Sequence, residues 1–393
     1  MAEMTSRERM LRAIGLREVD HIPCCFMLFT ALCEREDDTL DKLVKAEMAM
    51  GLDSRLLIPV TSRQEQVDHP DLWGLPVRFH PNVTIKEWRE RVRGDSDILH
   101  KEYATPAGTL ATSVRLSSDW PHGDHVPLLS DFLVPRSTKR LITGPDDLEA
   151  LRFLLSPPLE QDIAHFRREA AHARACADQH GVILAGGWGV GMDMTAWLCG
   201  MEEMIVATME RPSFAEDLLD IIHDWNMLRM GVVLSAPVDL YIRRGWYEGC
   251  DFVTPRFFQK AILPRLKKEA ALAHERGAKF ANIISSGSAP LLDFYLEADV
   301  DVLIGIDPIQ GTHTDMRSAK DRVGHRICLW GGVSGSITVE LGSEEDVRAA
   351  VQRAIQTLGH SGFILSPVDN VREVTPVTWR NVDVFIDEWR RHW

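Results

Sequence analysis

The chain has 393 residues, of which 45% are hydrophobic and 26% charged, a composition typical of a folded globular protein. Its formal net charge of −14, with no basic stripe, argues against nucleic-acid binding. It has no run of about 18 apolar residues, so no membrane span is expected. The N-terminus does not resemble a signal peptide, and seven scattered cysteines favour a reducing, cytoplasmic location.

Apolar runs that read as buried strands alternate with amphipathic helical stretches along most of the chain. The first helix is expected to begin with a capping box between Thr5 and Glu8. The predicted strands cover residues 21–27, 55–60, 181–189, 237–242, 279–285, 300–306, 326–330 and 362–366. Eight such repeats predict an α/β fold, a (β/α)8 TIM barrel that forms one domain over residues 1–393. A doubly wound open sheet is the alternative, weakened because no GxGxxG motif follows the first strand.

The alternation breaks between residues 64 and 142, where short alternating runs and turn residues predominate. KEYATPAGTLATSVRL is typical of a hairpin with its turn near residues 106–108. We therefore expect an inserted antiparallel β lobe over or beside the barrel mouth. Its aromatic and histidine side chains either cover a pocket or, as we favour, pack a thin sheet; they are Trp73, Trp88, Trp120, His122 and His125.

Residues 236–252 (APVDLYIRRGWYEGCDF) carry the densest chemistry in the chain. A predicted buried strand ends there in Arg243 and Arg244, and two aromatics, two carboxylates and a thiol follow. Active sites of TIM barrels form at the C-terminal ends of the strands. Either arginine could hold a carboxylate or phosphate bidentately. The alternative is that it pairs with Asp307 and only stabilises the barrel rim.

The ends of the other strands supply the remaining candidates. The catalytic candidates are Glu248, Asp307 and Asp369, because carboxylates whose pKa values are pushed apart can transfer protons. Trp188, Trp246 and Trp330 are expected to form apolar walls for a flat substrate. The other predicted substrate-binding residues are Tyr247, Ser286 and Asn370.

Several segments, taken in order, resemble the uroporphyrinogen decarboxylase superfamily, which includes methyltransferases that serve corrinoid proteins. RERMLRAIGLREVDHIP resembles its N-terminal helix and first strand, and WYEGCDFVTPRFFQKAILPRLK resembles the segment after its fourth strand. SSGSAPLLDFYLEADVDVL, LWGGVSG and GFILSPVDNVREVTP resemble its last four strand regions. The resemblance covers most of the chain outside residues 64–142 and implies a (β/α)8 barrel with its site at the top.

The chain departs from the decarboxylases of this family at their substrate-binding positions. Their RQAGR loop after the first strand is LFTAL here, so Leu28 and Leu32 replace the two arginines that hold substrate carboxylates. The carboxylate of their second strand has no counterpart in RLLIPVTSR, and their histidine after the eighth strand is Asp369. Decarboxylation of uroporphyrinogen is therefore not the favoured activity.

The chain also lacks the zinc ligands of the family's thiol methyltransferases. Ile284 and Ser286 stand at the positions of the HxC pair, and Asp369 at that of the cysteine after the eighth strand. We therefore expect no bound metal and no tightly bound cofactor, because an isoleucine offers no donor and a serine hydroxyl is a poor zinc ligand. A remade site is the alternative; it would draw on Glu248, Cys250, Asp251 and Asp369, with His122 or His125.

The resemblance leads to three hypotheses. The first is methyl transfer from a small, methoxy-type substrate to a partner corrinoid protein, with Glu248 or Asp369 as the acid. The second is decarboxylation of a porphyrinogen or another carboxylic acid held by Arg243 or Arg244. The third is non-catalytic binding of a tetrapyrrole or corrinoid. A homodimer is one option for the oligomeric state.

Overall fold

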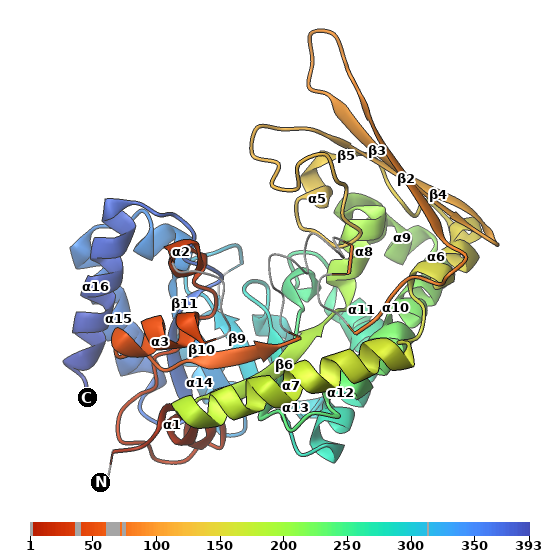
Figure 1. Ribbon diagram of the computed structural model, residues 1–393. Helices are drawn as coiled ribbons and strands as arrows, with labels where there is room; N and C mark the ends of the chain where they lie inside the picture. Colours follow the sequence, from red (N-terminus) through yellow and green to blue (C-terminus); the bar gives the residue numbers. More distant parts are fainter. Residues whose placement is uncertain (1–2, 36–40, 60–70, 73–75, 313) are drawn as a thin grey trace. The chain divides into compact units, whose positions relative to one another are not determined.

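The computed structural model describes residues 3–35, 41–59, 71–72, 76–312 and 314–393, drawn in colour in Figure 1. The chain divides into two compact units. The first unit comprises Met1–Val60, Arg168–Gly189 and Leu234–Trp393, and the second comprises Thr61–Arg167 and Val190–Val233. The long helix α7 (Glu160–His180) runs from the second unit into the first.

A curled, parallel seven-stranded sheet forms the centre of the first unit, and each strand corresponds to one predicted from the sequence. The strand order is β1-β6-β7-β8-β9-β10-β11. The strands are β1 (Arg55–Ile58), β6 (Ile183–Gly189), β7 (Leu240–Arg243), β8 (Lys279–Ile283), β9 (Val302–Ile306), β10 (Cys328–Ser334) and β11 (Phe363–Val368). All neighbouring pairs are parallel, which confirms the α/β class with a parallel sheet.

Helices follow most of these strands, as the sequence predicts. Three helices precede β1: α1 (Ser6–Ile14), α2 (Thr30–Arg35) and α3 (Lys42–Ala49). Those that follow strands in this unit are η2 (Trp246–Glu248), α11 (Pro255–Phe257), η3 (Phe258–Ile262), α12 (Leu263–Glu275), η4 (Ala289–Leu291), α13 (Leu292–Glu297), α14 (Met316–Val323), η5 (Gly335–Val339), α15 (Glu344–Leu358) and α16 (Pro376–Arg390). The capping box of α1 is confirmed, because Thr5 accepts from the amide of Glu8 while the Glu8 carboxylate accepts from that of Thr5.

The predicted first strand is the one that does not form a ladder. Within residues 21–27 only Cys24 forms a bridge, to Leu365 of β11. The amide of Met27 donates to the Ser366 side chain (2.7 Å), and the carbonyl of Phe26 accepts from the Arg55 side chain (2.7 Å). Side chains thus take some of the bonds that a strand would give to its neighbour. Among the described residues the pairing forms a curled, parallel seven-stranded sheet, and closure into an eight-stranded barrel is not shown.

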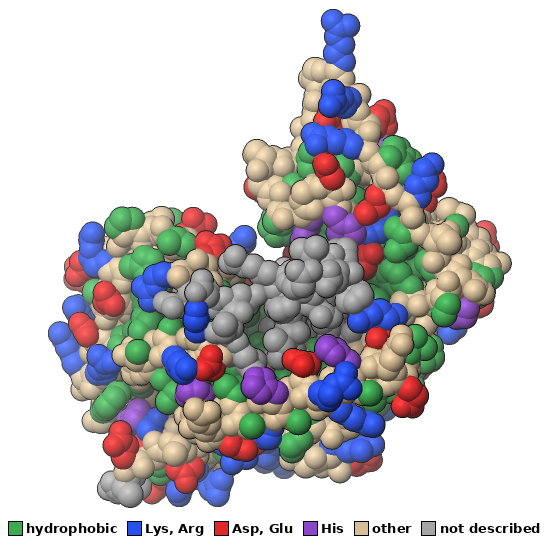
Figure 2. Space-filling model, viewed as in Figure 1, with side chains coloured by type: hydrophobic (Ala, Val, Ile, Leu, Met, Phe, Trp, Pro, Cys, Tyr) green, Lys and Arg blue, Asp and Glu red, His purple; other side chains and the backbone are tan. Residues whose placement is uncertain are grey.

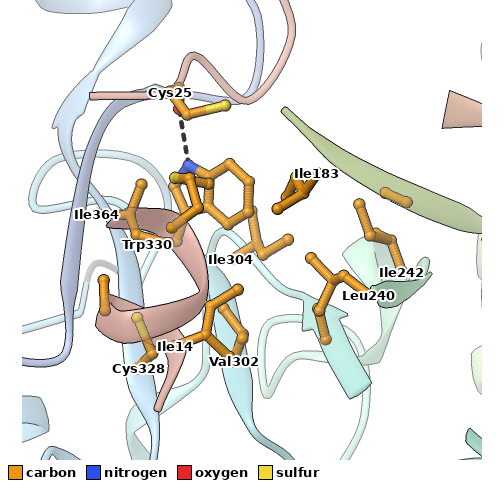
Figure 3. Close-up of a cluster of buried hydrophobic side chains, with 14 of the residues drawn as sticks. Ile14, Cys25, Ile183, Leu240, Ile242, Val302, Ile304, Cys328, Trp330 and Ile364 are labelled. Atoms are coloured by element: carbon orange, nitrogen blue, oxygen red, sulfur yellow. Dashed lines mark hydrogen bonds between the residues drawn. The ribbon is translucent and has the colours of Figure 1, made fainter. Parts of the chain in front are cut away.

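The inner face of the curled sheet holds the main apolar core of the unit (Figure 3). Alternate residues of the strands supply it, and three residues of α1 pack against them. The cluster comprises Met10, Ala13, Ile14, Cys25, Met27, Ile183, Ala185, Leu240, Ile242, Ala281, Ile283, Val302, Ile304, Cys328, Trp330 and Ile364. Leu28, Leu57 and Trp246 are partly buried side chains that pack against it.

The second unit contains the predicted antiparallel lobe. Its sheet has the order β2-β3-β4-β5, with strands β2 (Thr84–Glu90), β3 (Ile98–Thr105), β4 (Gly108–Arg115) and β5 (Ser137–Lys139). β3 and β4 form the predicted hairpin. The helices of the unit are α5 (Leu133–Arg136), η1 (Pro145–Asp147), α6 (Leu148–Leu154), α8 (Met192–Cys199), α9 (Met201–Glu210) and α10 (Pro212–Val233). The position of the 64–142 lobe near the barrel mouth stays a prediction.

The aromatic side chains of the lobe pack against its own residues. The ring of Trp88 stacks on His100, with centroids 4.9 Å apart, and Trp120 meets His122 edge-on at 5.0 Å. His125 bonds to Glu87 at 2.9 Å, and Trp73 lies outside the described residues. These contacts agree with the packing interpretation of the aromatic residues.

The described residues also bear on two classes of partner, membranes and nucleic acids. None of their helices combines the length and the apolar character that crossing a membrane requires. On the face drawn in Figure 2, acidic and basic side chains are interspersed, without a continuous basic stripe.

Candidate functional site

The alternation of strand β7 separates the two predicted arginines. Leu240 and Ile242 belong to the inner cluster, so Tyr241 and Arg243 point to the opposite face of the sheet. Tyr241 stacks there on Phe280, with centroids 6.3 Å apart. Arg244 is the next residue, and its amide continues the pairing by donating to Gly189 at 2.7 Å. Arg243 and Arg244 therefore serve different faces of the same strand.

Arg243 is a buried ion-pair residue, only 2% exposed. Its Nη1 and Nη2 donate to the two carboxylate oxygens of Glu248 at 2.5 and 2.8 Å, and its Nε donates to Glu269 of α12 at 2.5 Å. Nη1 also lies 3.1 Å from Oδ1 of Asn282. Burial acts to lower the pKa of Arg243, but the two carboxylates outweigh it and raise that pKa, so the guanidinium stays charged.

Arg244, Trp246 and Asp369 come together on the inner side, where β7 and β11 end. The guanidinium of Arg244 lies over the Trp246 ring, 4.6 Å from its centroid. The indole Nε1 of Trp246 donates to Oδ1 of Asp369 at 2.7 Å. Because β7 and β11 are not neighbours in the sheet, this bond joins separate parts of the rim formed by the strand ends. Asp369 has a left-handed backbone (φ 64°) directly after β11.

Two other predicted residues organise the loops that follow β8 and β9. Oδ1 of the buried Asp307 accepts from the amides of Ile309 (2.7 Å) and Gln310 (3.0 Å), as in an Asx turn. Ser286 bonds to the Asp251 carboxylate, which also accepts from the amide of Thr312 at 3.1 Å. Burial acts to raise the pKa of Asp251, but the hydrogen bonds to Thr312 and Ser286 lower it.

The remaining predicted substrate-binding residues are Trp330, Asn370, Tyr247 and Trp188, and the first three have side-chain contacts elsewhere in the unit. Trp330 is fully buried within the core cluster, and its Nε1 donates to the carbonyl of Cys25 at 2.8 Å (Figure 3). Asn370 ties the end of β11 to Thr30 of α2, at 2.8 Å between Nδ2 and Oγ1. Tyr247 packs edge-on against Phe252, with centroids 5.4 Å apart. The Trp188 backbone is part of β6, and its side chain is outside the described residues.

Arg55 is an inner-face residue that the sequence analysis did not predict as part of the site. It lies at the start of β1, and its Nη1 donates to Phe26 O at 2.7 Å and contacts the Cys25 sulfur at 3.3 Å. Its Nη2 donates to Met27 O, and its guanidinium lies over the Trp330 ring, 5.2 Å from the centroid. The signal in the sequence was a charged residue inside the apolar run RLLIPV, at its start.

Among the described residues, no group of three or more His, Cys, Asp or Glu side chains is arranged to hold a metal ion. Ile284 occupies the position of one zinc ligand in the methyltransferases that the chain resembles. Its side chain is apolar and fully buried. Burial and the nearby Asp251 raise the pKa of the Cys250 thiol, which works against a metal-binding thiolate. The donor set at these positions does not fit the thiolate–imidazole zinc site of the family.

Comparisons with known proteins place these observations in a family. The fold is similar to that of a methyltransferase from Methanosarcina mazei, with a TM-score of 0.60 and 17% identity over 99% of each chain. A B12-independent methionine synthase from Shewanella sp. W3-18-1 gives a TM-score of 0.46 at 9% identity, over 94% of this chain and 97% of that one. No curated protein sequence matches the chain. The model of the family "Uroporphyrinogen decarboxylase (URO-D)" matches residues 130–392. Since this match spans well over half of the sequence, the chain belongs to the uroporphyrinogen decarboxylase family.

Proposed function

We propose that this protein is a methyltransferase of the uroporphyrinogen decarboxylase family, which moves a methyl group from a small methoxy compound to a corrinoid on a partner protein. The observation that carries the proposal is the group of Arg244, Trp246 and Asp369. It combines a cation, a flat aromatic surface and a carboxylate at the end of the sheet where related barrels act. The structural similarity to a methyltransferase, at 17% identity, agrees with this reading but establishes the fold alone.

Asp369 is the carboxylate best placed to act as the acid. Both oxygens of Glu248 bond to Arg243, and Glu248 is 1% exposed. Asp307 is fully buried and holds two backbone amides of its own loop. Asp369 is half-buried on the inner side of the rim. These contacts support Asp369 as the proposed proton donor, and we propose for Glu248 a positioning role in the loop that carries Arg244 and Trp246.

The proposed step breaks the bond between the methyl carbon and the ether oxygen. The bonding pair stays with the oxygen, which takes a proton from Asp369, so an alcohol or phenol leaves. The methyl group passes to a reduced, Co(I) corrinoid, which supplies the electron pair for the new bond. Trp246 offers an aromatic surface for a ring of the substrate, and the Arg244 guanidinium that lies over it adds a positive charge at the rim.

The test follows methyl transfer to free cob(I)alamin by its absorbance change, with a panel of methoxybenzenes and methoxybenzoates. Asp369→Asn should lower the rate about 100-fold or more, the usual contribution of a general acid. The matched control, Asp293→Asn, changes an exposed carboxylate on α13 and should leave the rate unchanged. Release of CO2 from the benzoates without methyl transfer would instead support a decarboxylase, and corrinoid binding without turnover a carrier.

A further inference from the structure

Arg55 places a positive charge on the inner face of the curled sheet. Its strand neighbours Leu56 and Ile58 are buried on the outer face, whereas Leu57 packs against the inner cluster. The contacts of Arg55 with Cys25 and Trp330, both members of that cluster, show on which side its guanidinium lies. The side chain is half-buried.

The partners of Arg55 are neutral. Nη1 contacts a thiol and a carbonyl, and Nη2 donates to a carbonyl. The Glu47 carboxyl accepts a hydrogen bond from the Ser54 hydroxyl. Burial raises the pKa of Glu47, while this hydrogen bond and the charge of Arg55 act to lower it. Across the described parts of the chain, no carboxylate forms an ion pair with Arg55. The guanidinium is therefore a cation in a largely apolar setting without an opposite charge bound to it.

One donor of the guanidinium, the Nε–H, has no acceptor. Its five N–H groups comprise two on Nη1, two on Nη2 and one on Nε. The contacts of Nη1 account for two and that of Nη2 for one, while Nε is buried and has no acceptor. The Nε–H shares an edge of the guanidinium with one Nη2–H, in the fork that suits the two oxygens of a carboxylate.

We propose that this edge of Arg55 binds the carboxylate of a small monocarboxylic acid that enters the curled sheet. A buried donor without an acceptor is costly, and a carboxylate would satisfy it and neutralise the charge. Three partly buried apolar side chains on the same cluster, Leu28, Leu57 and Trp246, would contact the body of the molecule. The ligand is therefore an acid with one carboxylate and a compact apolar or aromatic body.

Binding of an acid at Arg55 deepens the proposed function, and it rests on that function only for the reaction that the bound acid then undergoes. It narrows the methoxy substrates to those that carry a carboxylate, such as methoxybenzoates. Binding of the acid needs neither a corrinoid nor turnover. A protein that binds the acid but transfers no methyl group would refute the proposed activity and leave the Arg55 site standing.

Isothermal titration calorimetry with 4-methoxybenzoate and its neutral analogue 4-methoxybenzamide tests the site in the full chain. The wild-type protein should bind the acid at least about 10-fold more tightly, because a charge-assisted hydrogen bond contributes more than a neutral one. Arg55→Met should abolish this preference, and Arg55→Lys should retain part of it. Arg326→Met, which removes an exposed arginine, should keep the wild-type preference.

Two outcomes would overturn the proposal. Equal binding of acid and amide by the wild-type protein would show that no cation selects the carboxylate, and this comparison stands even where Arg55→Met fails to fold. A preference that survives in Arg55→Met but disappears in Arg244→Met would place the carboxylate at the rim, on Arg244.

Discussion

Replacing Arg243 by methionine is expected to lower the free energy of unfolding strongly. The same replacement at Arg244 is expected to lower it much less. Methionine matches the length of the arginine stem but leaves Glu248 and Glu269, each 1% exposed, without their cation. Removing one partner from a buried ion pair costs about 3–5 kcal/mol. At Arg244 the half-buried guanidinium stacks on an indole, an interaction that contributes about 0.5–2 kcal/mol.

Urea denaturation of the full chain, followed by far-UV circular dichroism, measures the difference between the two variants. Glu269→Gln is the matched control, since it keeps the size of the side chain while removing one charge. Equal destabilisation by Arg243→Met and Arg244→Met would refute the assignment of the two side chains to opposite faces.

Three further changes test other parts of the first unit. Burial raises the pKa of Glu47 to about 7, so the folded protein binds this proton more tightly than the unfolded chain, and Glu47 lowers stability as the pH rises from 4.5 to about 7. Glu47→Gln should therefore stabilise the protein by about 2–3 kcal/mol at pH 8 and little at pH 4, as measured by urea unfolding at both values. Trp246→Phe keeps an aromatic ring but removes the 2.7 Å bond to Asp369; it should cost about 1–2 kcal/mol of stability and lower kcat/KM in the cobalamin assay, and unchanged values of both would show that the link is dispensable. Metal analysis of protein purified without chelators should find no stoichiometric zinc, and one equivalent that is lost in Cys250→Ser would contradict the metal-free expectation.

The sequence predicted most of the parallel sheet because each strand is a short apolar run that ends at glycine, proline or a polar residue. It did not predict the irregular pairing of residues 21–27. There Met27 bonds to the side chain of Ser366, and Phe26 to that of Arg55. These side chains come from distant positions in the chain and bond to backbone groups that would otherwise pair with a neighbouring strand. The local sequence of residues 21–27 does not reveal such contacts.

The composition of the site was readable, but its arrangement was not. The run from Leu240 to Ile242 is apolar, because both faces of this parallel strand are covered, so periodicity does not indicate which arginine faces inward. The bond between Trp246 and Asp369 joins residues 123 positions apart. Arg55 was not predicted because it stands at the beginning of a strand, whereas the active-site residues of barrels are expected at strand ends.

Trp246 has a consequence for how readily this family member can change its specificity. The same indole packs on the apolar cluster, contacts the Arg244 guanidinium and bonds to Asp369. A substitution that reshapes it for a new substrate would at once alter core packing and the placement of two polar groups, and effects at neighbouring positions of this kind are seldom additive. New specificities should therefore arise more easily through Leu28 or Leu57, which pack against the same core but have no polar side-chain partner to lose.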